Sequence, residues 1–457
     1  MPHPRPITYD KCEVCESLRE KGFPKPIVGQ FIPQATINDI KSARFHNWYF
    51  FTLGYSPQFV DYVIKKKKIA KNQRILDPFL GSGTTIVEAK SQTIPSVGID
   101  ANDFMVFASK VKTNWDLDTK NLETIRKIII QNSNKKIARL SSSGNQRIID
   151  NFIEQIKIYE PELTEELVDL IERRYISKKP LEKVIIIQEE LESISDQEMK
   201  DFFSLALYSI LVPASNVKFG PGFGIGPIKN DSEVIDLYRK KTLKMIEDLE
   251  FSTTKQKKTP TEVYLGDSRR LTEMLDEDSI DHMITSPPYP GDHEYTRHTR
   301  LELVISGMAK SKLEIRGIKD RMVRCSTRSV YKTDDESKEI KKFPQIIEIM
   351  KHIDRRVIET NGTSGFEKLY SKVVGEYFGG MYRFLKELNQ VLCPSGTAAF
   401  LVGDSHAFKM KHIETAKLLA EMAKEIGFSS YDLELWWNKR STSHSFFLPE
   451  YILNLTK

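Results

Sequence analysis

Short apolar runs recur along the chain at wide intervals, and each has the length of a β-strand. They cover Arg74–Phe79, Ser96–Asp100, Glu262–Asp267, Asp281–Thr285, Gly396–Asp404, Ser430–Trp437 and Glu450–Lys457. Helical patterns lie between several of them, for example Tyr377–Leu392. Strands that alternate with helices predict an α/β fold with a doubly wound, mostly parallel sheet. Residues 438–449 separate the last two strands and are too few for a helical crossover, which predicts an antiparallel pair.

Two long stretches interrupt this alternation. Residues 110–255 carry apolar side chains at helical spacing, which predicts a helical insertion with its own small core. The positions are Ile149, Phe152, Ile153, Ile156, Leu163, Leu167, Leu170 and Ile171. The glycine-rich segment 215–227 is expected to form no regular element, and is either a loop near substrate or a linker. Residues 296–375 are polar and rich in Lys and Arg, and are expected to be irregular.

Bulk composition places the chain among globular proteins. The 457 residues are 40% hydrophobic and 29% charged, with length enough for two or three domains. No apolar run has transmembrane length and the N-terminus has no signal-peptide pattern, so the cytoplasm is the expected location. The formal charge of +5 is compatible with a polyanionic partner. Cys12 and Cys15 are spaced like half of a zinc site, but a second pair is missing, so ordinary thiols and no bound metal are expected.

A glycine-rich turn follows the first strand. "ILDPFLGSGTTIVEAK" places Asp77 at the strand end, then residues 81–83, then Thr84 and Thr85 at the start of a helix, where one of them is expected to cap it. A phosphate-binding loop would need a lysine after the glycines, and Ile86 stands where a dinucleotide loop has a small residue. Because a helix N-terminus favours a negative group, a nucleoside that carries a carboxylate is expected, and S-adenosylmethionine fits this description.

Two further acids end strands in the same order along the chain. Asp100 ends "VGID", where a carboxylate can accept hydrogen bonds from ribose hydroxyls, and Asp267 follows "VYLG", where it can accept from an adenine amino group. Each acid alone is a weak signal. The cofactor-binding candidates are Asp77, Phe79, Gly81, Ser82, Gly83, Thr84, Thr85, Asp100 and Asp267.

A second motif follows the fourth strand, in "ITSPPYPGDHEYTRHTR". Pro287 and Pro288 exclude a helix or a central strand, so Ser286–Tyr289 is expected to be a stiff loop at the carboxyl end of a strand, where open α/β sheets bind ligands. The alternative is a proline-rich turn that merely ends the strand. Basic and aromatic residues beside such a loop suit phosphate contact and base stacking, or else form a solvated charged loop. They are His293, Tyr295, Arg297, His298 and Arg300.

Together these motifs resemble the amino-group DNA methyltransferases that accompany restriction enzymes. "DPFLGSGTT" resembles the family's cofactor loop, "TSPPY" resembles its catalytic loop, and Arg44–Ile64 looks like the segment that packs over the methionine end of the cofactor. The resemblance covers about residues 40–105, 260–295 and 375–457. A large helical block between the second and third strands departs from the common layouts, which leaves the place of the target-recognition region open.

The resemblance implies a Rossmann-like class I fold with a seven-stranded sheet, S-adenosylmethionine as cofactor, and a division of the chain into six parts. These are an N-terminal extension (1–35), core parts at 36–109, 256–295 and 376–457, the helical insertion (110–255), and a candidate target-recognition region (296–375) that includes the candidate DNA contacts Arg321, Arg324 and Arg328.

The resemblance also implies the chemistry. The amino nitrogen of a base is a poor nucleophile, and the Ser286 hydroxyl and the Pro287 carbonyl would accept its two hydrogens, held in place by Pro288. Tyr289 would stack on the flipped base. In the family, serine before the two prolines goes mostly with cytosine N4, so the expected product is N4-methylcytosine in double-stranded DNA, with a separately encoded restriction endonuclease as partner.

Three alternatives remain open. Adenine N6 needs the same chemistry, since a serine hydroxyl can donate to a ring nitrogen or accept from an amino group. RNA or a protein glutamine could replace DNA, although those enzymes usually carry Asn before the prolines. A catalytically silent DNA-binding protein would be expected to have lost Gly81, Gly83, Asp100 or Ser286, and all four are present.

Overall fold

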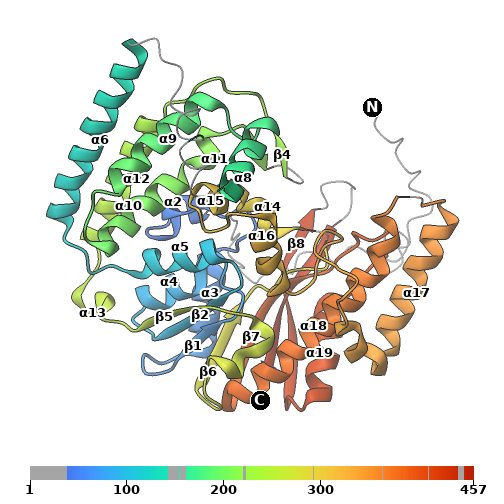
Figure 1. Cartoon of the computed structure of the whole chain (residues 1–457). Helices are drawn as coiled ribbons and strands as arrows, with labels where there is room; N and C mark the ends of the chain where they lie inside the picture. The colour runs from blue at the N-terminus through green and yellow to red at the C-terminus, as the bar shows by residue number, and fades with distance from the viewer. Residues whose placement is uncertain are drawn as a thin grey trace. The chain divides into compact units, whose positions relative to one another are not determined.

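A computed structural model describes residues 39–142, 154, 161–219, 223–291, 293–362, 364–409, 411–440 and 447–457 (Figure 1). The Cys12 and Cys15 pair, the N-terminal extension (1–35) and the helical pattern from Ile149 to Ile156 lie outside the described residues. The described chain forms two compact units. We call them the glycine-loop unit (described residues within 39–266 and 295–321) and the proline-loop unit (described residues within 267–294 and 322–457) after the motif that each contains.

The strands form one seven-stranded, mostly parallel sheet in the order β5-β2-β1-β6-β7-β9-β8. Parallel pairing joins β1 to β2, β2 to β5 and β6 to β7, whereas β9 is antiparallel to both β7 and β8. The predicted fold class is therefore confirmed, including the antiparallel pair at the end of the chain and a helical insertion. The predicted domain boundaries stay a prediction.

The glycine-loop unit contributes three strands of the sheet and most of the helices. Its elements are α2 (Asp39–Ser42), η2 (His46–Trp48), α3 (Pro57–Lys67), β1 (Ile75–Asp77), α4 (Thr84–Ser91), β2 (Ser96–Asp100), α5 (Asp103–Thr113), α6 (Thr119–Ser142), α8 (Pro161–Glu172), α9 (Lys178–Leu191), α10 (Gln197–Ser209), α11 (Leu211–Ala214), β3 (Val217–Phe219), β4 (Phe223–Ile225), α12 (Val234–Glu250), α13 (Thr254–Lys257), β5 (Thr261–Leu265), α14 (Tyr295–His298), α15 (Arg300–Ile305) and α16 (Lys312–Asp320).

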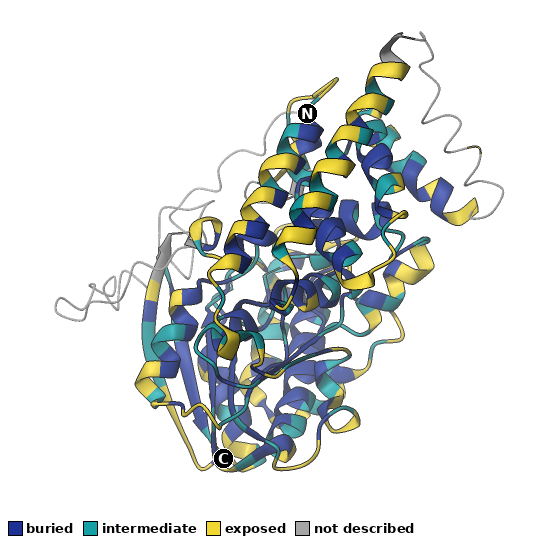
Figure 2. Ribbon diagram, turned by 90° about the vertical axis from the view of Figure 1, so that its left-hand side faces the viewer, coloured by how far each residue is buried: buried dark blue, intermediate teal, exposed yellow. Residues whose placement is uncertain are grey.

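The helices of the insertion enclose an apolar core. Helices α6, α9, α10 and α12 lie side by side, and Phe202, Phe203 and Leu205 on α10 are fully buried between them. Asp196 starts α10 by accepting a hydrogen bond from the Met199 N–H at 2.9 Å. Figure 2 shows where burial falls in the molecule: the inner strands of the sheet are buried, and many helices expose residues along one face.

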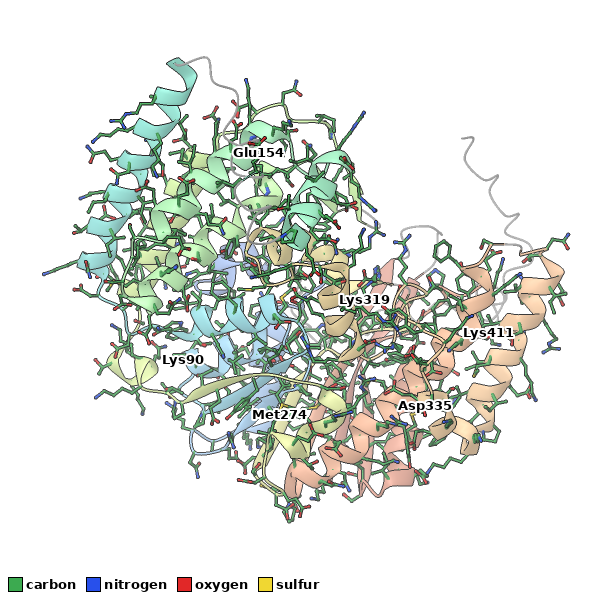
Figure 3. All side chains as sticks on the ribbon, viewed as in Figure 1. Lys90, Glu154, Met274, Lys319, Asp335 and Lys411 are labelled. Atoms are coloured by element: carbon green, nitrogen blue, oxygen red, sulfur yellow. The ribbon has the colours of Figure 1, made fainter. Side chains whose placement is uncertain are left out.

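A buried lysine anchors the β2–β5 edge of this unit. Lys90 of α4, labelled in Figure 3, donates to the carbonyl oxygens of Thr259 at 2.8 Å and Lys257 at 3.2 Å. Burial lowers the pKa of Lys90 to about 8. These bonds fix the chain just before β5.

The proline-loop unit contributes the other four strands. Its elements are η3 (Ser268–Glu273), β6 (Ile280–Thr285), η4 (Glu336–Lys342), α17 (Pro344–Glu359), η5 (Glu367–Leu369), α18 (Tyr370–Val391), β7 (Leu392–Gly403), α19 (Thr415–Ile426), β8 (Ser430–Arg440) and β9 (Phe447–Thr456). Helix α18 is the centre of its core, with Tyr377, Phe378 and Phe384 fully buried. Among the described residues, no helix is long and apolar enough to cross a membrane.

The expectation that segment 215–227 forms no regular element is wrong. Val217–Phe219 and Phe223–Ile225 form a short antiparallel pair, β3 and β4. Tertiary contact explains why strands form here despite the glycines: the Phe219 ring stacks on His298, with 4.9 Å between ring centroids. Asn216 adds a backbone bond by accepting from Gly226 N–H at 2.7 Å.

The expectation that residues 296–375 are irregular is also wrong, since helices α14 to α17 and the start of α18 occupy much of this stretch. Helix α17 begins at Pro344, a residue suited to the first helical turn, and buries Ile346, Ile353 and Val357 on one face. The many charges cover the opposite face and hide this periodicity. The division between the two units falls inside the stretch, after residue 321.

Candidate active site

The glycine loop (residues 77–85) turns from β1 into α4 within the glycine-loop unit. Gly81 and Gly83 have φ of 50° and 81°, values that side chains disfavour. A Cβ at Gly83 would lie 2.9 Å from Ser109 Oγ, whereas a Cβ at Gly81 would meet no heavy atom within 4 Å. The backbone is therefore packed at Gly83 and open to close approach at Gly81. The N-cap of α4 is Gly83, without a side-chain cap, so the expected threonine cap is wrong.

Asp100 ties the end of β2 to this loop. Its carboxylate accepts from the backbone N–H of Gly81 at 2.7 Å and of Asn102 at 2.8 Å. Asn102 in turn caps α5 by accepting from Phe104 N–H at 3.0 Å. Burial raises the pKa of Asp100 to about 7, against the opposing effect of the two N–H donors. Each carboxylate oxygen keeps a further lone pair, so Asp100 can still accept from a pair of hydroxyls.

Asp77 supports the same loop from inside. It is fully buried and accepts from the Tyr55 hydroxyl at 2.7 Å and from Phe79 N–H at 3.2 Å. The Tyr55 hydroxyl also lies 2.5 Å from Thr85 Oγ1. Burial, followed by the charge of Asp77, raises the pKa of Tyr55 well above its usual value, so this hydroxyl stays protonated. The segment before β1 is thus fastened to the glycine loop.

Ser82, at the tip of the loop, is held by a lysine that the sequence reasoning missed. The side chain of Lys112 on α5 is fully buried and donates to the Ser82 carbonyl oxygen. Burial, followed by the charge of Lys241, lowers the pKa of Lys112 to about 7. The Ser82 hydroxyl is itself buried without a hydrogen-bond partner in the described structure.

The proline loop (Ser286–Tyr289) follows β6 in the proline-loop unit, and its two hydroxyls converge on β7 and β9. Ser286 Oγ donates to the Leu401 carbonyl oxygen at 3.0 Å. The Tyr289 hydroxyl lies 2.9 Å from Glu450 Oε1, 3.2 Å from the Leu401 carbonyl oxygen and 3.4 Å from Ser286 Oγ. Ser286 and Tyr289 are each half-buried, so a substrate can reach them.

Packing fixes the position of this loop. Glu450 pairs with Gly403 across the β7–β9 ladder. A Cβ at Gly403 would lie 3.2 Å from Tyr289 Cε2, so the missing side chain makes room for the tyrosine ring. The Ser405 hydroxyl donates to the Pro290 carbonyl oxygen at 2.6 Å and holds the end of the loop.

Asp267 is bound to an arginine rather than open on all sides. Arg269 donates to it from the backbone N–H at 2.9 Å and from the guanidinium at 2.8 and 2.6 Å. The same guanidinium donates to Glu336 Oε1 at 2.6 Å, at the start of η4, next to Asp335 (labelled in Figure 3). The predicted adenine contact of Asp267 stays a prediction, with its carboxylate orientation set by Arg269.

Comparison with known proteins agrees with the glycine loop. A family model described as DNA methylase, of the N6/N4 type, matches residues 53–111, which span the segment before β1, the glycine loop and α5. The Type II methyltransferase M.BsoBI of Geobacillus stearothermophilus is 26% identical over 420 residues, covering 85% of this chain and 79% of that protein. These matches support an amino-group DNA methyltransferase of the restriction-modification type.

Further relatives carry the same description. The Type II methyltransferase M.AvaI of Nostoc sp. is 22% identical over 413 residues, covering 85% of this chain and 80% of its own length. The Type II methyltransferase M.MjaII of Methanocaldococcus jannaschii matches a smaller part. It is 27% identical over 149 residues, covering 33% of this chain and 25% of that protein. The long matches extend across the helical insertion, which therefore has counterparts in these relatives.

Several predicted DNA contacts of the methyltransferase have partners within the glycine-loop unit. Arg300 pairs with the buried Glu166 of α8. Arg321 donates to the Ala101 carbonyl oxygen at 3.0 Å and pairs with Asp103 at 2.8 Å. The other three predicted contacts in this unit are His298, Tyr295 and Arg297. The His298 ring stacks on Phe219, and the ring centroids of Tyr295 and Phe51 are 6.5 Å apart. Arg297 is half-buried.

The other predicted DNA contacts lie in the proline-loop unit. Arg324 is 5% exposed and pairs with Asp334 at 2.9 Å. Arg328 is exposed, and its guanidinium lies 5.8 Å from the Phe366 ring centroid. The half-buried His293 accepts a bond from Cys325 Sγ through its carbonyl oxygen. DNA contact stays a prediction for all of these residues, and the exposed Arg328 fits it better than the buried Arg324.

The structure thus joins the predicted site residues in two groups, one in each unit, and adds residues that the sequence reasoning did not assign. Tyr55 lies in Arg44–Ile64, the segment that resembles the one packed over the cofactor in the family. Its contact with the glycine loop could therefore have been predicted from the sequence. Lys112, Leu401 and Glu450 carried no such local signal. No group of three or more His, Cys, Asp or Glu among the described residues could hold a metal ion.

Proposed function

We propose that the methyltransferase transfers a methyl group from S-adenosylmethionine to the N4 atom of a flipped cytosine in double-stranded DNA, at a specific site and as the modification partner of a restriction endonuclease. The observation that carries this proposal is the Ser-Pro-Pro-Tyr loop, in which Ser286 donates its proton to the Leu401 carbonyl oxygen. Ser286 then presents lone pairs to a substrate, which suits an amino group that has hydrogens to donate.

The cofactor proposal rests on the glycine loop. The open backbone at Gly81, the unpartnered Ser82 hydroxyl and the N-terminus of α4 suit the carboxylate of an amino acid. We assign the ribose hydroxyls to Asp100 and the adenine amino group to Asp267. Bound S-adenosylmethionine supplies a methyl group attached to a positively charged sulfur.

The proline loop would activate the target nitrogen. The lone pair of an exocyclic amino group is delocalised into the ring, and acceptors on its two hydrogens favour a tetrahedral nitrogen. We assign these acceptors to Ser286 Oγ and the Pro287 carbonyl oxygen, and the face of Tyr289 to stacking on the base. Positioning then supplies much of the acceleration, because the nitrogen is held in line with the methyl group.

Ser286→Ala tests the assignment. Cofactor and DNA binding should persist while the single-turnover methylation rate falls at least about 100-fold, since the lost acceptor acts mainly in the transition state. Ser279 immediately precedes β6, at the end of the strand opposite to Ser286. Ser279→Ala removes a hydroxyl from the same unit and should leave the rate unchanged. A Ser286→Ala rate within about twofold of wild type would reject the role of this hydroxyl.

Digestion of methylated DNA to nucleosides, followed by mass spectrometry, decides the base. N4-methylcytosine is the expected product. N6-methyladenine alone would reject cytosine and support the adenine alternative, which uses the same fold. Methylation of RNA or protein without DNA methylation would reject DNA as the substrate.

A further inference from the structure

Glu450 is a carboxylate beside the proline loop that the proposed chemistry does not yet use. It lies on β9 opposite Gly403, and its Oε1 atom is 2.9 Å from the Tyr289 hydroxyl. The Tyr289 hydroxyl is in turn 3.4 Å from Ser286 Oγ, and both hydroxyls reach the Leu401 carbonyl oxygen. The two hydroxyl protons are therefore shared among these four possible hydrogen bonds.

The carboxylate decides how these two protons are distributed. A hydrogen bond to an ionised acceptor is stronger and shorter than one to a neutral carbonyl, so Tyr289 donates to Glu450 at 2.9 Å rather than to Leu401 at 3.2 Å. The Leu401 carbonyl is then left to the Ser286 proton, at 3.0 Å. With its own proton directed to Leu401, the Ser286 oxygen can only accept on its remaining sides.

We propose that Glu450 is a positioning residue that acts through Tyr289 and makes Ser286 a hydrogen-bond acceptor toward the target amino group. This inference rests on the proposed function, because an acceptor is needed only if an amino nitrogen is the nucleophile. Without the carboxylate charge, Tyr289 competes for the Leu401 carbonyl, and the Ser286 proton becomes free to point at the substrate. A donor in that position would oppose activation of the amino group.

The absence of a side chain at residue 403 supports this role. Gly403 leaves the space in which the Tyr289 ring lies, and a Cβ there would also stand 3.8 Å from Glu450 Oε1. The strand register places Glu450 on the same side of the ladder as that space. The ends of β7 and β9 are thus shaped to bring one tyrosine hydroxyl and one carboxylate together.

The test measures single-turnover methylation of a DNA duplex with saturating S-adenosylmethionine, and compares Glu450→Gln with Tyr289→Phe and the double variant. Glu450→Gln should lower the rate at least about tenfold, with the KM for the cofactor unchanged. In the Tyr289→Phe background the same change should have no further effect, because the link through the hydroxyl is already cut. Glu421→Gln on α19 removes the same charge elsewhere in this unit and should behave like wild type.

A wild-type rate for Glu450→Gln, or a loss that is equally large in the Tyr289→Phe background, would overturn the proposal. If Glu450→Gln does not fold, as judged by circular dichroism, Tyr289→Phe alone decides, since an unchanged rate contradicts a role for this hydroxyl. The product separates the two levels of the argument. N4-methylcytosine with a wild-type rate for Glu450→Gln overturns only the role of Glu450, whereas N6-methyladenine with a slowed variant overturns only the choice of base.

Discussion

Cofactor binding should depend on pH through Asp100, and replacing this residue by asparagine should remove the dependence. The pKa of Asp100 is raised to about 7 by burial. A carboxylate that accepts from ribose hydroxyls must be ionised, so the protonated fraction at low pH cannot bind in this way. With a pKa near 7, the dissociation constant for S-adenosylmethionine should rise about tenfold between pH 8 and pH 6, or about 1.4 kcal/mol.

Asp100→Asn should also weaken binding at every pH. In the wild type, one oxygen of Asp100 accepts from Gly81 N–H and the other accepts from Asn102 N–H. Asparagine has only one side-chain oxygen, so it can replace one of these two bonds. One backbone donor then loses its partner, which weakens the loop in the free and bound states alike. The amide also offers the ribose no ionised acceptor, and a hydrogen bond to a charged group is worth about 1.5–3 kcal/mol, or about 10- to 150-fold in affinity. Lys112 titrates in the same pH range, and it is retained in both proteins, so the difference between them isolates Asp100.

Isothermal titration calorimetry from pH 5.5 to 8.5 would measure both effects. The sign is fixed by the direction of the shift: the wild type binds best above pH 7 and loses affinity as the pH falls. Thermal unfolding without cofactor should show the opposite trend, because a raised folded pKa means that stability falls as the pH rises from about 4, the unfolded value, to about 7. Equal pH dependence of cofactor binding in wild type and Asp100→Asn would refute the assignment of Asp100 to the ribose.

Two further predictions concern residues with buried partners. Lys112→Met keeps an apolar side chain but leaves the Ser82 carbonyl oxygen without its donor. Cofactor affinity measured by calorimetry should therefore fall by about 5- to 100-fold. An unchanged affinity would show that the glycine loop does not need this hydrogen bond. Arg328→Ala should reduce the salt dependence of DNA affinity and leave the melting temperature unchanged, because Arg328 is exposed. Arg324→Ala leaves Asp334 buried and unpaired, so it should lower the melting temperature measurably. The reverse pattern would contradict the argument from exposure.

The sequence predicted the parts of the site that are local in the chain. A strand followed by Gly81 and Gly83, and a strand followed by Ser286 and two prolines, each form a loop at the carboxyl end of a strand whatever packs around it. The sheet could be predicted for the same reason, because each strand has its own short apolar run. In the stretch 296–375 the helices were missed because charge on the exposed faces outweighed a periodicity that α17 does contain.

The supporting residues could not be predicted because their partners are distant in sequence. Tyr289 meets Glu450 across 161 positions, and Lys112 meets Ser82 across 30. Nothing in "LPEYIL" or "SKVKT" distinguishes these residues from ordinary charged positions. The hairpin of β3 and β4 has the same origin, since the stacking of Phe219 on His298 depends on a helix 79 positions later in the chain.

The path of the chain has a consequence for how the protein is made. Among the described residues the chain passes from one unit to the other three times, after residues 266, 294 and 321. The bonds of Arg300 to Glu166 and of Arg321 to Asp103 belong to the unit that contains the glycine loop, yet both arginines are translated after β6. That unit therefore cannot be completed until residue 321 has left the ribosome, and β6 is translated before its own unit's strands β7 and β9. No single cut of the polypeptide releases either unit whole, so a split enzyme made from two fragments would have to assemble both halves at once.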